Sequence, residues 1–315
     1  MSPRRGEKLM VPEAEFTSYY GRPIIKTPVW ENPDVPAYLF LGGLAGASSA
    51  LAACAQYSGY GELARVSKTG AGVAVSLSAV FLVHDLGRPK RFLHMLRVFK
   101  PTSPMSMGSW LLAAYGPAAG AAAACAVTGR FPRIGLAATG AAAVMGPGIA
   151  TYTAALICDT AVPAWHGAHR EMPYLFAGSA AAAAGGLGML ALPPARARPA
   201  AQLAVLGAAA ELTAEYFLER RLGSVAEPYH AGRSGVLMKT AKALTACGLG
   251  AAVLARGRRS RALSVLAGVT LMTASAVTRF GVFEAGLASA RDPKYTVGPQ
   301  RERITERERA GEPVA

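Results

Sequence analysis

The sequence predicts an all-α integral membrane protein with eight transmembrane helices. Hydrophobic residues make up 52% of its 315 positions and charged residues only 17%, which is unusual for a soluble domain. Eight mostly apolar runs follow one another, and a run of about 20 such residues spans a bilayer as a helix. Little sequence lies between the runs, so eight buried helices of a soluble protein would explain them poorly.

The net charge and the cysteines narrow the possible functions. A charge of +14 suits nucleic acid, anionic lipid or acidic partners, but the arginines stand between apolar runs and no nucleic-acid-reading motif is present. Each of the four cysteines stands alone in an apolar run, so no iron–sulfur cluster or zinc site is expected in this chain. We expect a lipid bilayer, and no nucleic acid, around this protein.

The domain organisation follows from the runs. Residues 1–36 are polar and proline-rich without the apolar core of a signal peptide, so they are predicted to be an extramembrane arm. The transmembrane domain is predicted over residues 37–284 and an extramembrane tail over residues 285–315. The predicted spans are Ala37–Tyr57, Val66–His84, Ser106–Val127, Ile134–Asp159, Met172–Leu192, Ala200–Phe217, Val236–Leu254 and Ala262–Phe283.

The eight predicted spans are rich in small residues, as in "AAGAAAACA" from Ala118 and "SAAAAAGGLG" from Ser179. Small residues lower the hydropathy of a helix but let two helices approach closely. The second span ends on His84 and Asp85. The fourth ends on Asp159, with Tyr152 two turns earlier, and its Gly-Pro-Gly at residues 146–148 is a potential break.

The last three spans carry ionisable residues. The sixth has Glu211, Glu215 and Glu219 at i, i+4 and i+8, which puts them on one stripe of a helix. The seventh begins with Lys239 and Lys242, and the eighth has Arg279 and Glu284 near its end. Because charges at membrane depth are costly, Glu211, Glu215, Lys239 and Lys242 are interpreted either as salt bridges between neighbouring helices or as a proton relay, and the two interpretations are compatible.

An even number of spans places both termini on one side of the membrane. The connections on the opposite side are short and carry ten Lys or Arg and a single acid, Glu62. All five histidines lie on the terminal side, so that side is predicted to hold the chemistry. Short basic loops favour the cytoplasm, which would place the termini outside it, but the terminal side is also basic and the charge rule alone leaves the orientation open.

His84 and Asp85 have two interpretations. They are either an interfacial pair that only ends a helix or part of a binding site, and the second is favoured because Arg88 and Asp159 should lie at a similar depth in the membrane. The strip after them, up to Phe99, fits a short amphipathic helix in the interface, which either gates the entry of a lipid-soluble molecule or anchors the loop.

A quinol suits a site of this kind, since it needs a proton acceptor and hydrogen-bond donors. His84 is the natural acceptor, with Asp85 or Asp159 to orient it. With no haem-ligand pair, flavin motif or cysteine cluster, the electrons would have to pass to another chain.

Several segments resemble the NrfD/PsrC family of membrane subunits. The long block "HDLGRPKRFLHMLRVFKPTSPMSMGSW" from His84 is the most specific of them. The others are "YYGRPIIKTPVW" from Tyr19, "PAYLFLGGLAGASSALA" from Pro36, "YTAALICDTAVPAWHGAHREMPYLFAGSA" from Tyr152 and "SARDPKYTVGPQRER" from Ser289.

The resemblance implies eight helices in two four-helix bundles and a role as the non-autonomous quinone-binding subunit of an oxidoreductase complex. It implies menaquinone or ubiquinone as the exchangeable ligand, a ferredoxin-like partner with four [4Fe–4S] clusters and, in many complexes, a molybdopterin catalytic subunit. By motif, His84, Asp85 and Arg88 belong to the quinone end of the second span, and Tyr152, Asp159 and His166 line the side of the fourth.

Two other functions stay open. An ion-translocating or transporter-like subunit without redox chemistry would also use buried Glu and Lys residues. A passive membrane anchor with a degenerate quinone site would keep the same fold.

Overall fold

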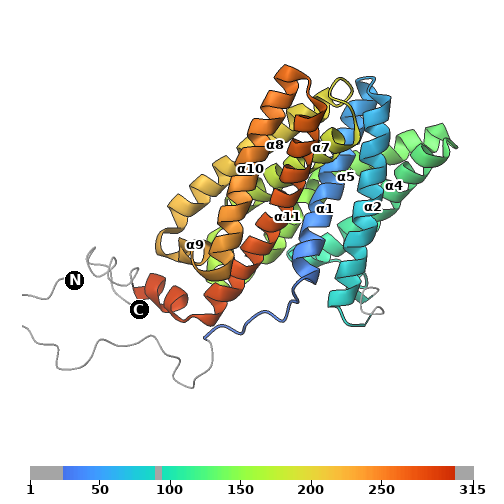
Figure 1. Ribbon diagram of the computed structural model, residues 1–315. Coiled ribbons are helices and arrows are strands. Elements are labelled where there is room, and N and C mark those ends of the chain that lie inside the picture. Colours follow the sequence, from blue (N-terminus) through green and yellow to red (C-terminus); the bar gives the residue numbers. More distant parts are fainter. Residues whose placement is uncertain (1–23, 89–93, 302–315) are drawn as a thin grey trace, which may run out of the picture.

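The computed structural model describes residues 24–88 and 94–301. These residues form helices and no strand, and eight of the helices have 20 or more residues (Figure 1). At about 1.5 Å per residue, 20 residues reach across the hydrocarbon core of a bilayer. The long helices are α1 (Asp34–Tyr57), α2 (Gly61–Asp85), α4 (Pro104–Thr128), α5 (Pro132–Cys158), α7 (Met172–Ala191), α8 (Arg198–Leu222), α10 (Gly232–Arg258) and α11 (Arg261–Arg291).

Three short elements lie between the long helices: α6 (Pro163–Gly167), the 3₁₀ turn η1 (Gly223–Ala226) and α9 (Glu227–His230). Prolines stand in the first turns of α4, α5, α7 and α8, where a fixed φ favours helix initiation and the missing N–H costs nothing. Six of the long helices contain a predicted span and extend it, whereas α5 and α7 each end one residue before the predicted end of the span. The largest extension is at the end of α11, which continues past Phe283 to Arg291.

Seven of the described helices are long and apolar enough to cross a membrane, which confirms the all-α membrane class but only seven of the eight predicted spans. The exception is α8. Its 25 residues are sufficient in length, but Glu211, Glu215 and Glu219 make it too polar to qualify by composition.

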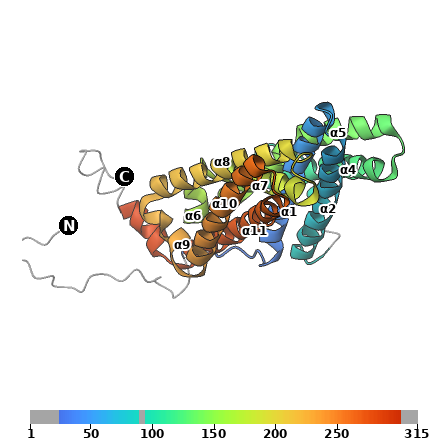
Figure 2. The same ribbon diagram turned by 45° about the horizontal axis from the view of Figure 1, so that its top comes forward.

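The long helices pack in two sets. In the first, α1 contacts α2 and α5, and α4 contacts the same two helices. In the second, α7 contacts α8 and α11, and α10 contacts the same two. Helices α1, α5, α7 and α11 join the sets (Figures 1 and 2). The described chain begins and ends at the same end of these helices, which we call the terminal end.

The contact between α1 and α5 depends on glycine. A Cβ on Gly46 would lie 2.3 Å from the carbonyl oxygen of Gly146, and a Cβ on Gly146 would lie 2.4 Å from that of Gly46. The two backbones therefore touch without an intervening side chain. The Gly-Pro-Gly segment does not break the helix, because α5 is continuous from Pro132 to Cys158.

Candidate functional site

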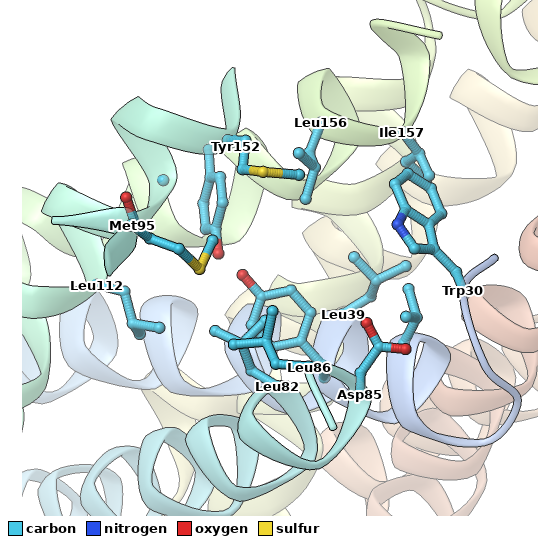
Figure 3. Close-up of a pocket in the computed structure, with 15 residues that line it drawn as sticks. Trp30, Leu39, Leu82, Asp85, Leu86, Met95, Leu112, Tyr152, Leu156 and Ile157 are labelled. Atoms are coloured by element: carbon cyan, nitrogen blue, oxygen red, sulfur yellow. The ribbon is translucent and has the colours of Figure 1, made fainter. Parts of the chain in front are cut away.

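A cavity of about 190 Å³ lies at the terminal end of the first helix set (Figure 3). The start of α1, the end of α2, the start of α4 and the end of α5 form its walls, and Trp30 of the arm that precedes α1 closes one side. Most of the lining side chains are apolar. The lining residues are Trp30, Val35, Tyr38, Leu39, Leu82, Asp85, Leu86, Met95, Met105, Gly108, Ser109, Leu112, Tyr152, Leu156 and Ile157.

Asp85 and Tyr152 bring polar groups into this apolar space. Asp85 projects from the end of α2 and Tyr152 from α5, and Figure 3 shows both side chains pointing into the cavity. One oxygen of the Asp85 carboxylate accepts a hydrogen bond of 3.1 Å from the backbone N–H of Glu31, which ties the arm to the end of α2. The ring of Tyr152 lies against Gly108 of α4, where only a glycine leaves room for it.

His84 does not line the cavity. Its Nδ1 lies 2.5 Å from Oδ2 of Asp34 at the start of α1, and its side chain is 74% exposed whereas that of Asp34 is 6% exposed. The imidazole therefore connects a buried carboxylate to the surface. Its partner is Asp34 and neither of the carboxylates that the sequence favoured, Asp85 and Asp159.

The arm before α1 is fixed to both helix sets. Trp30 stacks on Trp165 of α6 at a ring distance of 5.5 Å, and Trp165 in turn packs on Phe283 of α11. The indole N–H of Trp165 donates to the carbonyl of Val282, 2.8 Å away. The side-chain amide of Asn32 donates to Glu284, 2.6 Å away. One wall of the cavity is thus held by residues of the second set.

The remaining residues predicted for the quinone site lie outside the cavity. Arg88, three residues after α2, and Asp159, directly after α5, are both exposed. His166 is exposed on α6, with Nδ1 3.3 Å from the carbonyl oxygen of Cys158, and its ring stacks on that of His169. Of the predicted set, the structure brings together only Asp85 and Tyr152.

A second cavity, of about 270 Å³, adjoins the first through the shared residues Met95, Met105 and Ser109. His94 lines it, which places the end of the predicted amphipathic strip beside the site. Residues 89–93 of that strip, with Arg91, Phe92 and Leu93, lie outside the described residues.

The buried carboxylates of α8 lie in the second helix set. Glu211 is 3% exposed and accepts hydrogen bonds from Thr278 of α11, at 2.8 Å, and Thr245 of α10, at 3.4 Å. Arg279, which is fully buried, interacts electrostatically with Glu211 and donates to the carbonyl of Phe176 of α7, 2.9 Å away. Its Nε and Nη1 have no hydrogen-bond partner among the described residues.

A line of charged groups leads from there towards the terminal end. Nζ of Lys242 lies 3.5 Å from Glu215 and 3.1 Å from Glu219, and Glu219 lies 4.0 Å from Nε2 of His230. The side chains of Glu215, Glu219 and His230 are 6%, 25% and 48% exposed, so these groups become more exposed towards the terminal end, and Lys242 between them is 44% exposed. Lys239, which the sequence placed in this group, is exposed and forms no ion pair with the described residues.

Within residues 24–88 and 94–301, no group of three or more His, Cys, Asp or Glu side chains is arranged to hold a metal ion. The four cysteines are free.

Sequence reasoning missed Asp34, Trp30 and Tyr38. The first span was predicted to begin at Ala37, which left Asp34 in the arm. The signal was present in "ENPDVPAY", because an acid directly after a proline is typical of a first helical turn.

Comparison with known proteins adds one finding. A protein family described as polysulphide reductase, NrfD, matches residues 25–208, which is more than half of the chain. The matched range contains every residue that lines the first cavity and ends within α8. No curated protein matches the chain.

Proposed function

This chain belongs to the NrfD family, described as polysulphide reductase, and we propose on that basis that it is the membrane subunit through which an oxidoreductase complex exchanges electrons with the quinone pool. It is a multi-pass membrane protein of a family associated with such complexes. The proposal places the head group of menaquinone or ubiquinone in the first cavity.

The observation that carries this proposal is the position of the Asp85 carboxylate and the Tyr152 phenol in a mostly apolar cavity within the family-matched range. An apolar ring with polar oxygens needs this combination of lining and polar groups. At about 190 Å³, the cavity is smaller than the roughly 300–1,000 Å³ of sites that enclose whole drug-sized ligands. It therefore suits a head group whose isoprenoid tail lies outside, past Met95 and Met105.

The reaction must place two protons, because a quinol releases two protons and two electrons when it becomes a quinone. In the proposed arrangement the Asp85 carboxylate accepts the first proton directly from a quinol hydroxyl, while the phenol of Tyr152 donates a hydrogen bond to a ring oxygen. Asp85 releases that proton through His84, held by Asp34, to water at the surface. The carboxylate, ionised again, then accepts the second proton, which leaves by the same path. Arg88, Asp159 and His166 were predicted from the sequence as quinone-binding residues. They lie outside the cavity, and a role in the site stays a prediction.

The two electrons need an acceptor in another chain, and we propose an iron–sulfur protein of the ferredoxin type with four [4Fe–4S] clusters, docked at the terminal end. The arm before α1 supports this placement. The backbone of Glu31 bonds to Asp85 of the cavity and Trp30 forms part of the cavity wall, so a protein docked on the arm would lie close to the ligand. A molybdopterin subunit would complete the complex. For a complex that reduces quinone, the same steps run in reverse.

We propose that α8 is the eighth span, so that the two helix sets are two four-helix bundles in the membrane. Its neighbours α7 and α10 both qualify as spans, and Glu211 and Glu215 face the protein interior, where their charge avoids lipid. The basic short connections then favour the cytoplasm, with the termini on the extracytoplasmic side of the cell membrane.

A second candidate function is proton transfer through the second helix set, by Glu211, Glu215 and Lys242. The observation that favours it is the row of carboxylates Glu211, Glu215 and Glu219, which lie in the second helix set and become more exposed towards the terminal end. Lys242 is paired to two of them. Lys239 stays a prediction as a member of this relay, since it lies on the same helix one turn nearer the terminal end.

The test is Asp85→Asn in the intact complex, because asparagine keeps the shape of the side chain but accepts no proton. Loss of a general base costs about 10²–10⁴-fold in rate, so quinol oxidation should fall at least a hundredfold. Binding of a quinone analogue, followed by quenching of the fluorescence of Trp30, should persist. Asp292→Asn, at the exposed end of α11, is the matched control. Wild-type turnover by Asp85→Asn, with all subunits present, would refute the proposal.

A further inference from the structure

A basic cavity lies at the opposite end of the second helix set from the chain termini. It has a volume of about 320 Å³ and lies between the α7–α8 and α10–α11 connections. Arg198, the first residue of α8, lines it together with Arg256 of the last turn of α10 and Arg259 just beyond. Half of this cavity lies outside the family-matched range.

The walls of this cavity are fixed by a fourth arginine. Arg261 donates from Nη1 to the carbonyl oxygen of Met189, 2.9 Å away, and from Nη2 to that of Leu190, 2.6 Å away. Ser264 donates to the same Met189 carbonyl at 3.0 Å. These bonds satisfy carbonyls at the end of α7, which have no partner within the helix, and join the start of α11 to α7.

The three lining arginines carry charge that the protein does not neutralise. None of them forms an ion pair with the described residues. The single acid of the short connections, Glu62, is already bound by Arg196 through two hydrogen bonds of 2.5 and 2.8 Å. Three positive charges therefore face one cavity at the level where the helices end.

Two further features select the ligand. The cavity lies at the N-terminus of α8, which no side chain caps, and a helix N-terminus favours a negatively charged group. Its floor is apolar, made by Met189, Ala201 and Ala255. A cationic rim over an apolar floor at the membrane surface matches an amphiphile with a negatively charged head.

We propose that this cavity binds the phosphate group of an anionic phospholipid, with Arg198, Arg256 and Arg259 around the phosphate and the acyl chains along the outside of the bundle. Basic pockets between transmembrane helices are suited to such head groups. The site is independent of quinone chemistry, because it lies at the far end of the other helix set from the first cavity.

The test uses the full chain, purified in detergent with any subunits that accompany it, and native mass spectrometry after incubation with phosphatidylglycerol, cardiolipin or phosphatidylcholine. The variant combines Arg198→Gln, Arg256→Gln and Arg259→Gln. Each basic residue at an anionic surface contributes about 1 kcal/mol, or roughly fivefold in affinity, so retention of the anionic lipids should fall at least tenfold. The control combines Arg130→Gln, between α4 and α5, with Arg133→Gln, in the first turn of α5; both residues are exposed at the same end, and the variant should retain lipid.

Three results would overturn the proposal. Equal retention of phosphatidylcholine and the anionic lipids would show that charge is not recognised. Equal loss in the control variant would show a general surface effect. Displacement of all bound lipid by millimolar inorganic phosphate, with phosphate retained in its place, would identify a free anion as the ligand. Thermal unfolding of the triple variant, measured alongside, separates lost binding from lost fold.

Discussion

Gly108→Ala should close the proposed quinone cavity from within. A Cβ at this position would lie 2.2 Å from Cε2 and 2.6 Å from Cδ2 of Tyr152. An ordinary contact begins at 3.4 Å, so the ring has to move by at least about 1.2 Å. Because both residues line the cavity, the displaced ring enters the volume of the ligand and its hydroxyl leaves the position from which it can donate.

A misplacement of about 1 Å can cost a hundredfold in rate, and we expect a loss of that order in kcat/KM for quinol oxidation. Binding of a quinone analogue should weaken in parallel, because the obstruction acts on the ligand in its ground state. Wild-type affinity and turnover in Gly108→Ala would refute the assignment of this cavity, since the clash cannot be avoided while α4 and α5 keep their contact.

Two variants separate obstruction from misfolding. Gly120→Ala, on the same helix with nothing within 4 Å of the added carbon, should behave as the wild type. Gly108→Ala combined with Tyr152→Leu removes the clash, so its stability should return to that of Tyr152→Leu alone. Such non-additivity is expected for residues in contact.

Three further predictions concern residues that the structure brings together. Asp34→Asn removes the charge opposite His84, so quinol oxidation should fall about tenfold while binding of the analogue, measured by fluorescence quenching, persists. Gly46→Ala forces its helix away from Gly146, and such overpacking should cost about 1–3 kcal/mol, seen as a lower midpoint of thermal unfolding in detergent. Trp30→Ala removes one cavity wall and an aromatic stack worth about 0.5–1.5 kcal/mol, so affinity for the analogue, measured by competition with quinol, should fall about threefold to tenfold.

Each of these has a control or a contradicting outcome. Gly140→Ala, in an open position of α5, should leave the unfolding midpoint near that of the wild type, and an equal drop in both variants would contradict the glycine contact. Trp30→Phe keeps an aromatic ring and should retain most of the affinity. Unchanged turnover in Asp34→Asn would remove the His84 pair from the proton path.

The helices could be predicted because a bilayer-spanning run is a local property of the sequence. Each of the eight long helices coincides with a predicted span except for differences at its ends. Helix α8 shows the limit of apolar composition as a signal, because it is long enough to span a membrane but too polar to be recognised as a span. Its carboxylates are tolerated because Thr278, Thr245 and Lys242 of neighbouring helices surround them, and such contacts cannot be read from the helix itself.

The site was harder to predict because its pairs are distant in sequence. Asp85 and His84 are adjacent, but successive residues of a helix point about 100° apart, so one faces the cavity and the other Asp34, 50 positions away. Lys239 and Lys242 were grouped by spacing alone, yet only Lys242 reaches the glutamates of α8.

The arm before α1 connects the cavity of the first helix set to the second set. Trp30 is at once a wall of the cavity and part of an aromatic stack that extends through Trp165 to α11. A partner that moved the arm would therefore change the shape of the cavity, and thermodynamic linkage makes the effect of partner on ligand equal to that of ligand on partner. If the proposed complex and quinone ligand are correct, we expect the isolated subunit to hold the ligand with a different affinity from the assembled one, and ligand occupancy to change assembly by the same factor.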